Sequence, residues 1–251
     1  MSQRYSNRDD RARSSDEGDD GGGLAFYVPC HRTESSRDYI AECVGRIREL
    51  YPKAGLYVID DASPMELPSL DADVIKSEFP GAGELLPYYY AHQRREARRI
   101  VAMHDSCFLH ARLPTEAWQG GFRPLWTAGH NWDAKTDYTK MLGKLRSPGR
   151  LTELAVRSDD WDVCFGVMGL TNLTFLDKVE REHGVLSILP QVVSTRTERM
   201  ACERVFGLLA SAYGSRKGYM GDIHEYGWGQ TAHQYFTRTS ARPLEKIWTG
   251  R

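Results

Sequence analysis

The stretch that decides the fold is residues 24–61, LAFYVPCHRTESSRDYIAECVGRIRELYPKAGLYVIDD. Its apolar run at 24–28 is stopped by Pro29 and predicts a buried strand. Residues 35–38 are typical of a helix start, and apolar residues then recur at helical spacing up to position 50. Residues 55–59 predict a second strand. A strand, a helix and another strand in this order predict a parallel βαβ unit with a right-handed crossover.

The same pattern continues along the chain. Further strands are predicted at 73–76, 99–103 and 163–168, and further helices at 83–95, 172–183 and 197–213, with loops and short helices at 120–150. The fold class predicted is therefore α/β, with a mostly parallel central sheet flanked by helices in a single domain, residues 24–251. Residues 1–23 contain no Leu, Ile, Val or Phe and end in three glycines, which predicts a disordered N-terminal tail.

Composition excludes several classes of protein. The 251 residues contain 33 Lys and Arg against 34 Asp and Glu, so we expect no nucleic acid partner. No apolar run is long enough to predict a membrane span, and the N-terminus lacks the apolar core of a secretory signal. The five cysteines are scattered without a CxxC pair, which favours reduced thiols in a cytoplasmic protein.

Polar residues directly follow three of the predicted strands. They are Pro29 to His31, Asp60 with Asp61, and His104 to Ser106. Because ligands of open α/β sheets bind outside the carboxyl ends of the strands, we expect these residues to face one cleft. Two plainer interpretations stay open: residues 60–64 can be a turn, and residues 104–106 can cap a helix.

Several classes of ligand for that cleft are excluded because their binding motifs do not occur in the sequence. The turn after the first strand is PCHRTES, without the GxGxxG of dinucleotide sites, and the chain contains no GxxxxGK[ST], GxSxG or HExxH motif. Carboxylates at strand ends remain, and these suit Mg²⁺ or Mn²⁺ shared with substrate phosphates. The natural ligand is a metal-bridged nucleoside diphosphate.

PCHRT after the first strand and LYVIDDASP around the second resemble the nucleotide-binding start of GT-A fold glycosyltransferases. The later segments FPGAGELLPYYY, VAMHDSCF, CFGVMG, TRTERMACERVFG and GDIHEYGWGQTAHQYF are similar to a branch found in large algal DNA viruses and protists. The resemblance covers most of residues 24–236. It implies a Rossmann-like domain that binds a nucleotide-diphosphate sugar, and a host-cytoplasmic location if the protein is viral.

The resemblance also assigns roles to particular residues. Asp60 and Asp61 match the acids that contact the nucleotide, and Asp105 matches the last acid of the metal-binding D-x-D motif, with Met103 in place of its first acid. His224 matches the C-terminal histidine that often adds to the metal, which implies Mn²⁺ or Mg²⁺ as cofactor. The remaining strand-end candidates for nucleotide-sugar binding are Pro29, His31 and His104.

An inverting transferase also needs a general base for the acceptor hydroxyl. The candidates in the C-terminal half are Glu203, Glu198 and Asp162, with Asp160 beside the last. For Glu203 the plain alternative is an ion pair with Arg199 or Arg204. Trp126, Trp132 and Trp228 are candidates for stacking on sugar faces, against the alternative of ordinary packing.

The expected function is transfer of a hexose or pentose from a nucleotide-diphosphate sugar, with UDP implied by the family, to a hydroxyl of a glycan or glycoprotein acceptor. Two alternatives remain. A nucleotidyltransferase also uses acids and a metal in a Rossmann-like sheet. A non-catalytic protein on a degenerate transferase fold would explain the incomplete D-x-D motif.

Overall fold

The computed structural model describes residues 23–118, 120–130, 135–226, 229–237 and 242–248. The tail predicted for residues 1–23 lies outside the described residues, except for Gly23. The described residues bury one large hydrophobic cluster that contains side chains from both halves of the chain.

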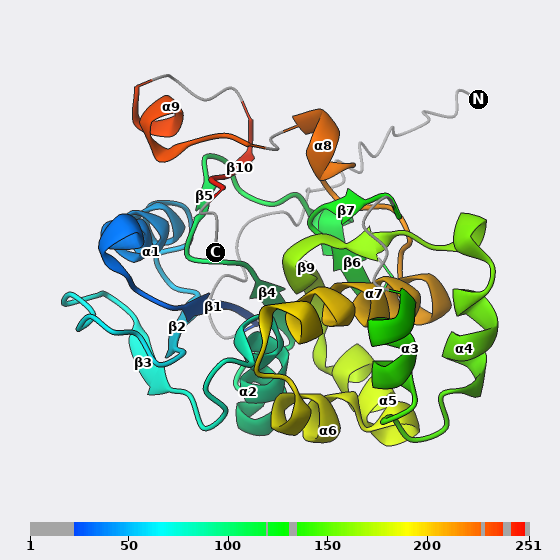
Figure 1. The fold of residues 1–251 in the computed structure, drawn as a ribbon. Coiled ribbons are helices and arrows are strands. Elements are labelled where there is room, and N and C mark those ends of the chain that lie inside the picture. The colour runs from blue at the N-terminus through cyan, green and yellow to red at the C-terminus, as the bar shows by residue number, and fades with distance from the viewer. Residues whose placement is uncertain (1–22, 119, 131–134, 227–228, 238–241, 249–251) are drawn as a thin grey trace, which may run out of the picture.

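The centre of the molecule is a six-stranded sheet with the strand order β3-β2-β1-β4-β9-β6 (Figure 1). The first four of these strands run parallel, and β9 pairs antiparallel with both β4 and β6. The predicted α/β class with a mostly parallel central sheet is confirmed. The strands are β3 (Asp73–Lys76), β2 (Gly55–Asp60), β1 (Leu24–Cys30), β4 (Arg99–Ala102), β9 (Gly169–Asn172) and β6 (Phe122–Pro124).

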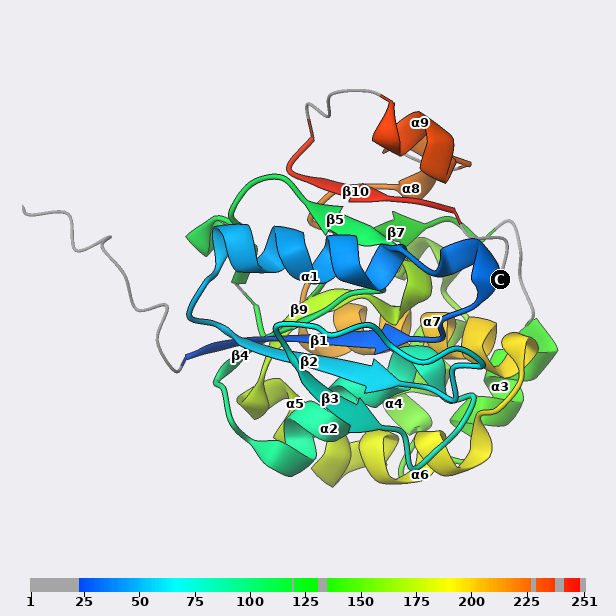
Figure 2. The ribbon, with the colours of Figure 1, turned by 90° about the vertical axis from the view of Figure 1, so that its left-hand side faces the viewer.

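Helices cover both faces of this sheet. Figure 2 shows α1 (Tyr39–Leu50) above it and α2 (Leu86–Arg94), α5 (Leu173–His183) and α6 (Val185–Val192) below it. The buried face of α1 carries Ile40, Cys43, Val44 and Ile47, which is the helical spacing seen in the sequence. The first crossover therefore forms as predicted, because β1 is buried along its whole length and α1 offers it one apolar stripe.

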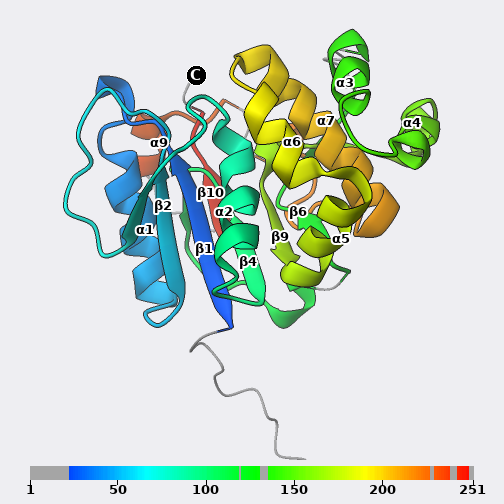
Figure 3. The ribbon, with the colours of Figure 1, turned by 90° about the horizontal axis from the view of Figure 1, so that it is seen from below.

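The C-terminal half is built on α7 (Arg196–Tyr213), against which α3 (Lys135–Leu142) and α4 (Gly149–Ala155) pack. Thr195 begins α7 with a capping box. Figure 3 shows α7 and α6 towards the side of the sheet where β9 and β6 lie. The last elements are α8 (Ile223–Tyr226), α9 (Ala232–Phe236) and β10 (Leu244–Lys246), and β10 pairs with β5 (Cys107–Leu109).

The single strand predicted at residues 163–168 is wrong. The chain forms the short β8 (Val163–Cys164), paired with β7 (Thr127–Ala128), and then a tight turn over Phe165–Val167. The strand that enters the central sheet here is β9, which was not predicted. Its last residue, Asn172, was predicted to begin the following helix. Asn172 is in fact the N-cap of α5, with its side chain accepting a hydrogen bond from the backbone N–H of Phe175.

The predictions about membrane-spanning segments and cysteines also concern the described residues. None of the helices among the described residues is long and apolar enough to cross a membrane. All five cysteines are buried thiols.

Candidate functional site

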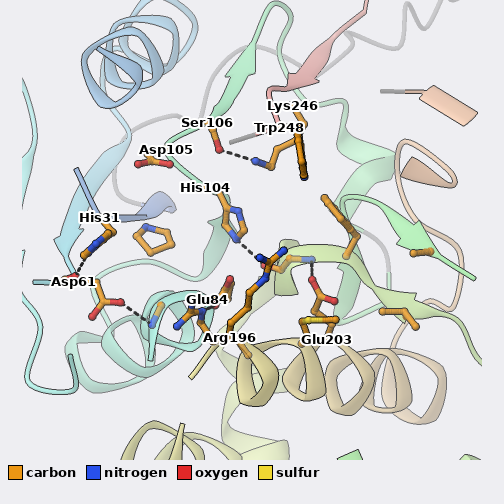
Figure 4. A pocket seen from close by; sticks show the side chains of 18 of the residues that line it. His31, Asp61, Glu84, His104, Asp105, Ser106, Arg196, Glu203, Lys246 and Trp248 are labelled. Carbon is orange, nitrogen blue, oxygen red and sulfur yellow. Dashed lines mark hydrogen bonds and ion pairs between the residues drawn. The ribbon is translucent and has the colours of Figure 1, made fainter. Parts of the chain in front are cut away.

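A cavity of about 610 Å³ opens at the carboxyl ends of β1, β2 and β4 (Figure 4). Its wall is completed by the loop at 81–84, the turn at 165–166, the first half of α7 and the C-terminal strand β10. A volume of this size is typical of small-molecule and cofactor sites. The polar residues that follow three separate strands therefore do meet at one cleft, as the sequence predicted.

Most of the candidate residues line this cavity. Seven of the ten contribute to its wall, and they come from segments up to 195 positions apart: Pro29, His31, Asp61, His104, Asp105, Glu203 and His224. The other three, Asp60, Glu198 and Asp162, do not line it.

The structure shows what those three carboxylates do instead. Asp60 accepts a hydrogen bond from the backbone N–H of Ser63, so the turn interpretation holds for it. Glu198 accepts the backbone N–H groups of Ser194 and Thr195 and closes the capping box of α7, and these bonds lower its pKa. Asp162 forms a two-bond ion pair with Arg216 at the surface.

Asp61 is buried and positions the loop across from it. Its two carboxylate oxygens accept the backbone N–H groups of Gly81, at 2.7 Å, and Gly83, at 3.1 Å. Burial raises the pKa of Asp61, while these two hydrogen bonds oppose the rise. Its backbone carbonyl also fixes the ring of His31, whose Nδ1 lies 2.8 Å away. Asp61 thus organises one end of the cavity.

Replacing Asp61 by Asn should destabilise the protein. The amide of Asn can accept only one of the two backbone N–H groups and places its own N–H₂ against the other, which costs about 2 kcal/mol. Chemical denaturation should show this loss, and Asp71→Asn, at an exposed loop carboxylate paired with Arg48, is the control. Equal stability of D61N and the unmodified protein would contradict this role.

Asp105 lines the cavity and is only 3% exposed. The next residue, Ser106, accepts a hydrogen bond at 2.6 Å from the Nζ of Lys246 on β10. A backbone bond from the N–H of Ile247 to the carbonyl oxygen of Ser106 holds the two segments together. A buried carboxylate and a lysine ammonium therefore occupy the same part of the wall.

Two hydrogen bonds connect a series of three residues in another part of the cavity wall: His104, Gly166 and Glu203. The ring Nε2 of His104 lies 2.9 Å from the carbonyl oxygen of Gly166 and donates to it. The backbone N–H of Gly166 in turn donates to Oε1 of Glu203 at 2.8 Å. The turn that makes both contacts holds Gly166 and Val167 at positive φ, and the hydroxyl of buried Tyr88 donates to the carbonyl of Val167. A β-branched residue at positive φ stores strain of the kind found at functional sites.

Gly166→Ala should distort this series. The Cβ would lie 2.8 Å from Cε1 of His104 and 3.0 Å from Cε of Met168, at a φ of +61° that alanine adopts at a cost. We expect a loss of about 2 kcal/mol in unfolding free energy together with weaker ligand binding. Gly149→Ala, which meets open space, is the matched control for the denaturation curves. A G166A protein as stable as G149A would contradict the strain argument.

Glu203 has the electrostatic properties of a proton-transfer group. Burial raises its pKa to about 7, although the N–H of Gly166 and the guanidinium of Arg204 favour the charged form. The Arg204 Nη1 lies 3.3 Å from Oε2, so one of the two alternative ion pairs does form. The side chain is still 19% exposed, and it faces the cavity. Its pKa therefore suits a general base near neutral pH.

Cations balance the acids of the cavity wall. Arg199 pairs with Glu84 at 3.3 Å, and burial raises the pKa of that carboxyl group. Arg196, at the start of α7, and Lys246 add positive charge to the lining. Arginine and lysine side chains in such a wall can bind an anionic group, such as a diphosphate.

The residues proposed for a metal ion are only partly assembled. Asp105 and His224 both line the cavity, and Nδ1 of His224 lies 2.9 Å from a carboxylate oxygen of Asp222. In the described part of the chain, no three His, Cys, Asp or Glu side chains come close enough to hold an ion by themselves. Asp105 and His224 offer the oxygen and nitrogen atoms that can share an ion with substrate phosphates, and the metal site stays a prediction.

Arg196, Lys246 and Trp248 are among the wall residues that were not singled out from the sequence. Trp248 is half exposed at the cavity. Of the tryptophans proposed for sugar stacking, Trp126 is 2% exposed and packs in the core, whereas Trp132 and Trp228 lie outside the described residues. No local pattern marks β10, because a three-residue strand is identified only by its partner β5.

No protein-family model and no curated protein matches the sequence. Among solved structures, TarS 1-349 from S. aureus is similar with a TM-score of 0.42 and 12% identity, over 74% of this chain and 56% of that one. S. aureus TarS gives a TM-score of 0.46 and 13% identity, over 80% of this chain and 36% of that one. The chain thus spans about half and about a third of these two proteins. Similarity at this level carries no argument about function.

Proposed function

We propose that the protein is a GT-A-like glycosyltransferase that uses a nucleotide-diphosphate sugar, with UDP as the nucleotide. The observation that carries this proposal is the single cavity in which Asp61, Asp105 and Glu203 meet at the carboxyl edge of a mostly parallel sheet. The PCHRT and VIDDASP segments, whose resemblance suggests the same function, supply two of its walls.

Different parts of the cavity suit different parts of the donor. His31 and Asp61, at the ends of β1 and β2, offer a ring and a carboxylate for hydrogen bonds to the nucleoside. Lys246 and Arg196 offer positive charge for the diphosphate. In Figure 4, His31 and Asp61 lie on one side of His104, and Lys246 and Glu203 lie on the other. The donor would span the cavity across His104.

Asp105, with the help of His224, is the residue that would hold Mn²⁺ or Mg²⁺ together with diphosphate oxygens. A bound ion would neutralise the charge that develops on the leaving diphosphate. Lys246 lies beside Ser106 in the cavity wall, and its ammonium group would stabilise the negative charge on the leaving diphosphate with or without the ion.

Glu203 is the residue we assign to the acceptor. In an inverting transfer, the acceptor oxygen forms a bond to the anomeric carbon, the bond from that carbon to the diphosphate oxygen breaks, and the acceptor proton passes to Glu203. The carboxylate can take this proton near neutral pH because its pKa is about 7. The product would be a glycoside on a glycan or protein hydroxyl, and the nucleoside diphosphate would leave.

The proposal is tested by incubating the protein with a panel of UDP- and GDP-sugars, with and without Mn²⁺. We expect thermal stabilisation by UDP and release of UDP from at least one donor. Neither a thermal shift nor donor turnover with any nucleotide sugar would contradict the proposal. Release of pyrophosphate from a nucleoside triphosphate plus a sugar phosphate would instead identify a nucleotidyltransferase.

A further inference from the structure

The cavity has one wall of a different character from the others. Besides Arg196, Arg204 and His224, the part of the lining that comes from β7, β8, α7 and the turn at 165–166 includes small and apolar residues: Ala128, Gly129, Val163, Phe165 and Met200. Trp248 adds an aromatic ring to the lining of the same cavity. In Figure 4, Trp248 and Glu203 both lie across from His31 and Asp61, so this side lies away from the proposed nucleoside end.

The exposure of Trp248 is unusual for its position. Four large hydrophobic side chains among the described residues are well exposed: Val74, Val156, Phe236 and Trp248. Of these, Trp248 alone lines the cavity, with 50% of its surface exposed. A half-exposed indole in the lining of a cavity can contact a ligand that binds there.

The backbone that carries this ring is well fixed. The N–H of Trp248 donates to the carbonyl of Gln230 at 2.8 Å, and the N–H of Ile247 donates to the carbonyl of Ser106 at 2.9 Å. The preceding residues form β10, paired with β5. The indole is therefore presented by an ordered strand end, and a ligand that stacks on it meets a largely preorganised surface.

The indole of Trp248 and the carboxylate of Glu203 together favour one class of acceptor. A pyranose has an apolar face of C–H groups and a rim of hydroxyls, so it can lie flat on an indole while one hydroxyl reaches a carboxylate. The side chain of a protein Ser or Thr has a hydroxyl but no flat apolar face. An aromatic ring and a proton-accepting Glu203 on one side of the cavity are thus matched to a sugar.

We propose that Trp248 is the acceptor platform and that the acceptor is a glycan, whose terminal pyranose stacks on the indole. This inference rests on the proposed transferase function and specifies its second substrate. It makes Trp248 a specificity-determining residue for the acceptor, next to Lys246, which is assigned to the donor diphosphate.

The test measures binding of two probes to the unmodified protein and to W248A, W248F and F236A. One probe is UDP, and the other is a panel of methyl pyranosides and short linear oligosaccharides. Binding is measured by saturation-transfer NMR and titration calorimetry. We expect W248A to weaken saccharide binding about tenfold, W248F to retain most of it, and neither to change UDP affinity. F236A removes another exposed aromatic ring, from α9, and should change neither affinity.

Other outcomes separate this inference from the function on which it rests. Saccharide binding that is equal in W248A and the unmodified protein, or absent from both, overturns the platform. Loss of UDP affinity in W248A with unchanged saccharide binding also overturns it and assigns the ring to the nucleotide. Failure of the unmodified protein to bind UDP contradicts the proposed transferase, while a Trp248-dependent saccharide site would still be detected.

Discussion

Asp105→Asn should reduce sugar transfer by about a thousandfold while leaving the fold intact. Asp105 lines the cavity and is 3% exposed, and asparagine has nearly the same shape without the negative charge. A residue that holds the diphosphate through a cation loses that ability when its charge is removed. The measurement is steady-state release of UDP, compared with the circular dichroism spectrum and the unfolding midpoint of each protein.

The matched control for this variant is Asp38→Asn. Asp38 is an exposed N-cap residue of α1 outside the cavity, and Asn is equally suited to that position. D38N should keep full turnover. If D105N also keeps full turnover, the assignment of Asp105 is wrong, and the interpretation as a non-catalytic protein on a transferase fold gains support.

Glu203→Gln should lower kcat by about a hundredfold and remove the main pH dependence of the reaction. The base must be deprotonated to accept the acceptor proton, and the pKa of Glu203 is about 7. Activity of the unmodified enzyme should therefore fall about tenfold for each pH unit below that value and level off above it. The measurement is kcat/KM from pH 5 to 9 for both proteins.

A second readout separates catalysis from structure in this variant. UDP affinity should be the same in E203Q and the unmodified protein, because Glu203 lies away from the nucleoside end of the cavity. Glu153→Gln, on an exposed face of α4, is the control and should keep the full pH profile. A pH profile in E203Q with the same midpoint as the unmodified enzyme would show that another group is the base.

Local patterns were enough to predict the elements from β1 to β4. The apolar run at 24–28, the helical spacing after Asp38 and the second run at 55–59 each report one buried face, and together they fix a parallel βαβ unit. The strand-end rule then places Asp61 and Asp105 at one edge without any knowledge of contacts. This rule correctly predicted the position of the cavity.

The rest of the site depends on contacts that no local pattern records. Glu198 and Glu203 lie five residues apart on α7, yet one caps the helix and the other faces the cavity. Lys246 reaches Ser106 across 140 positions because β10 pairs with β5, and three-residue strands have too little periodicity to be recognised. The turn at Phe165–Val167 was missed because its positive φ angles occur within an apolar run that resembles a strand.

The central claim is that this cavity binds a nucleoside diphosphate with its phosphates between Asp105 and Lys246. A crystal structure of the protein with UDP and Mn²⁺ tests it most directly. The account predicts the nucleoside beside His31 and Asp61, and a diphosphate oxygen within hydrogen-bond distance of the Lys246 ammonium. UDP bound outside the cavity, or within it with its phosphates remote from both Asp105 and Lys246, would contradict the account.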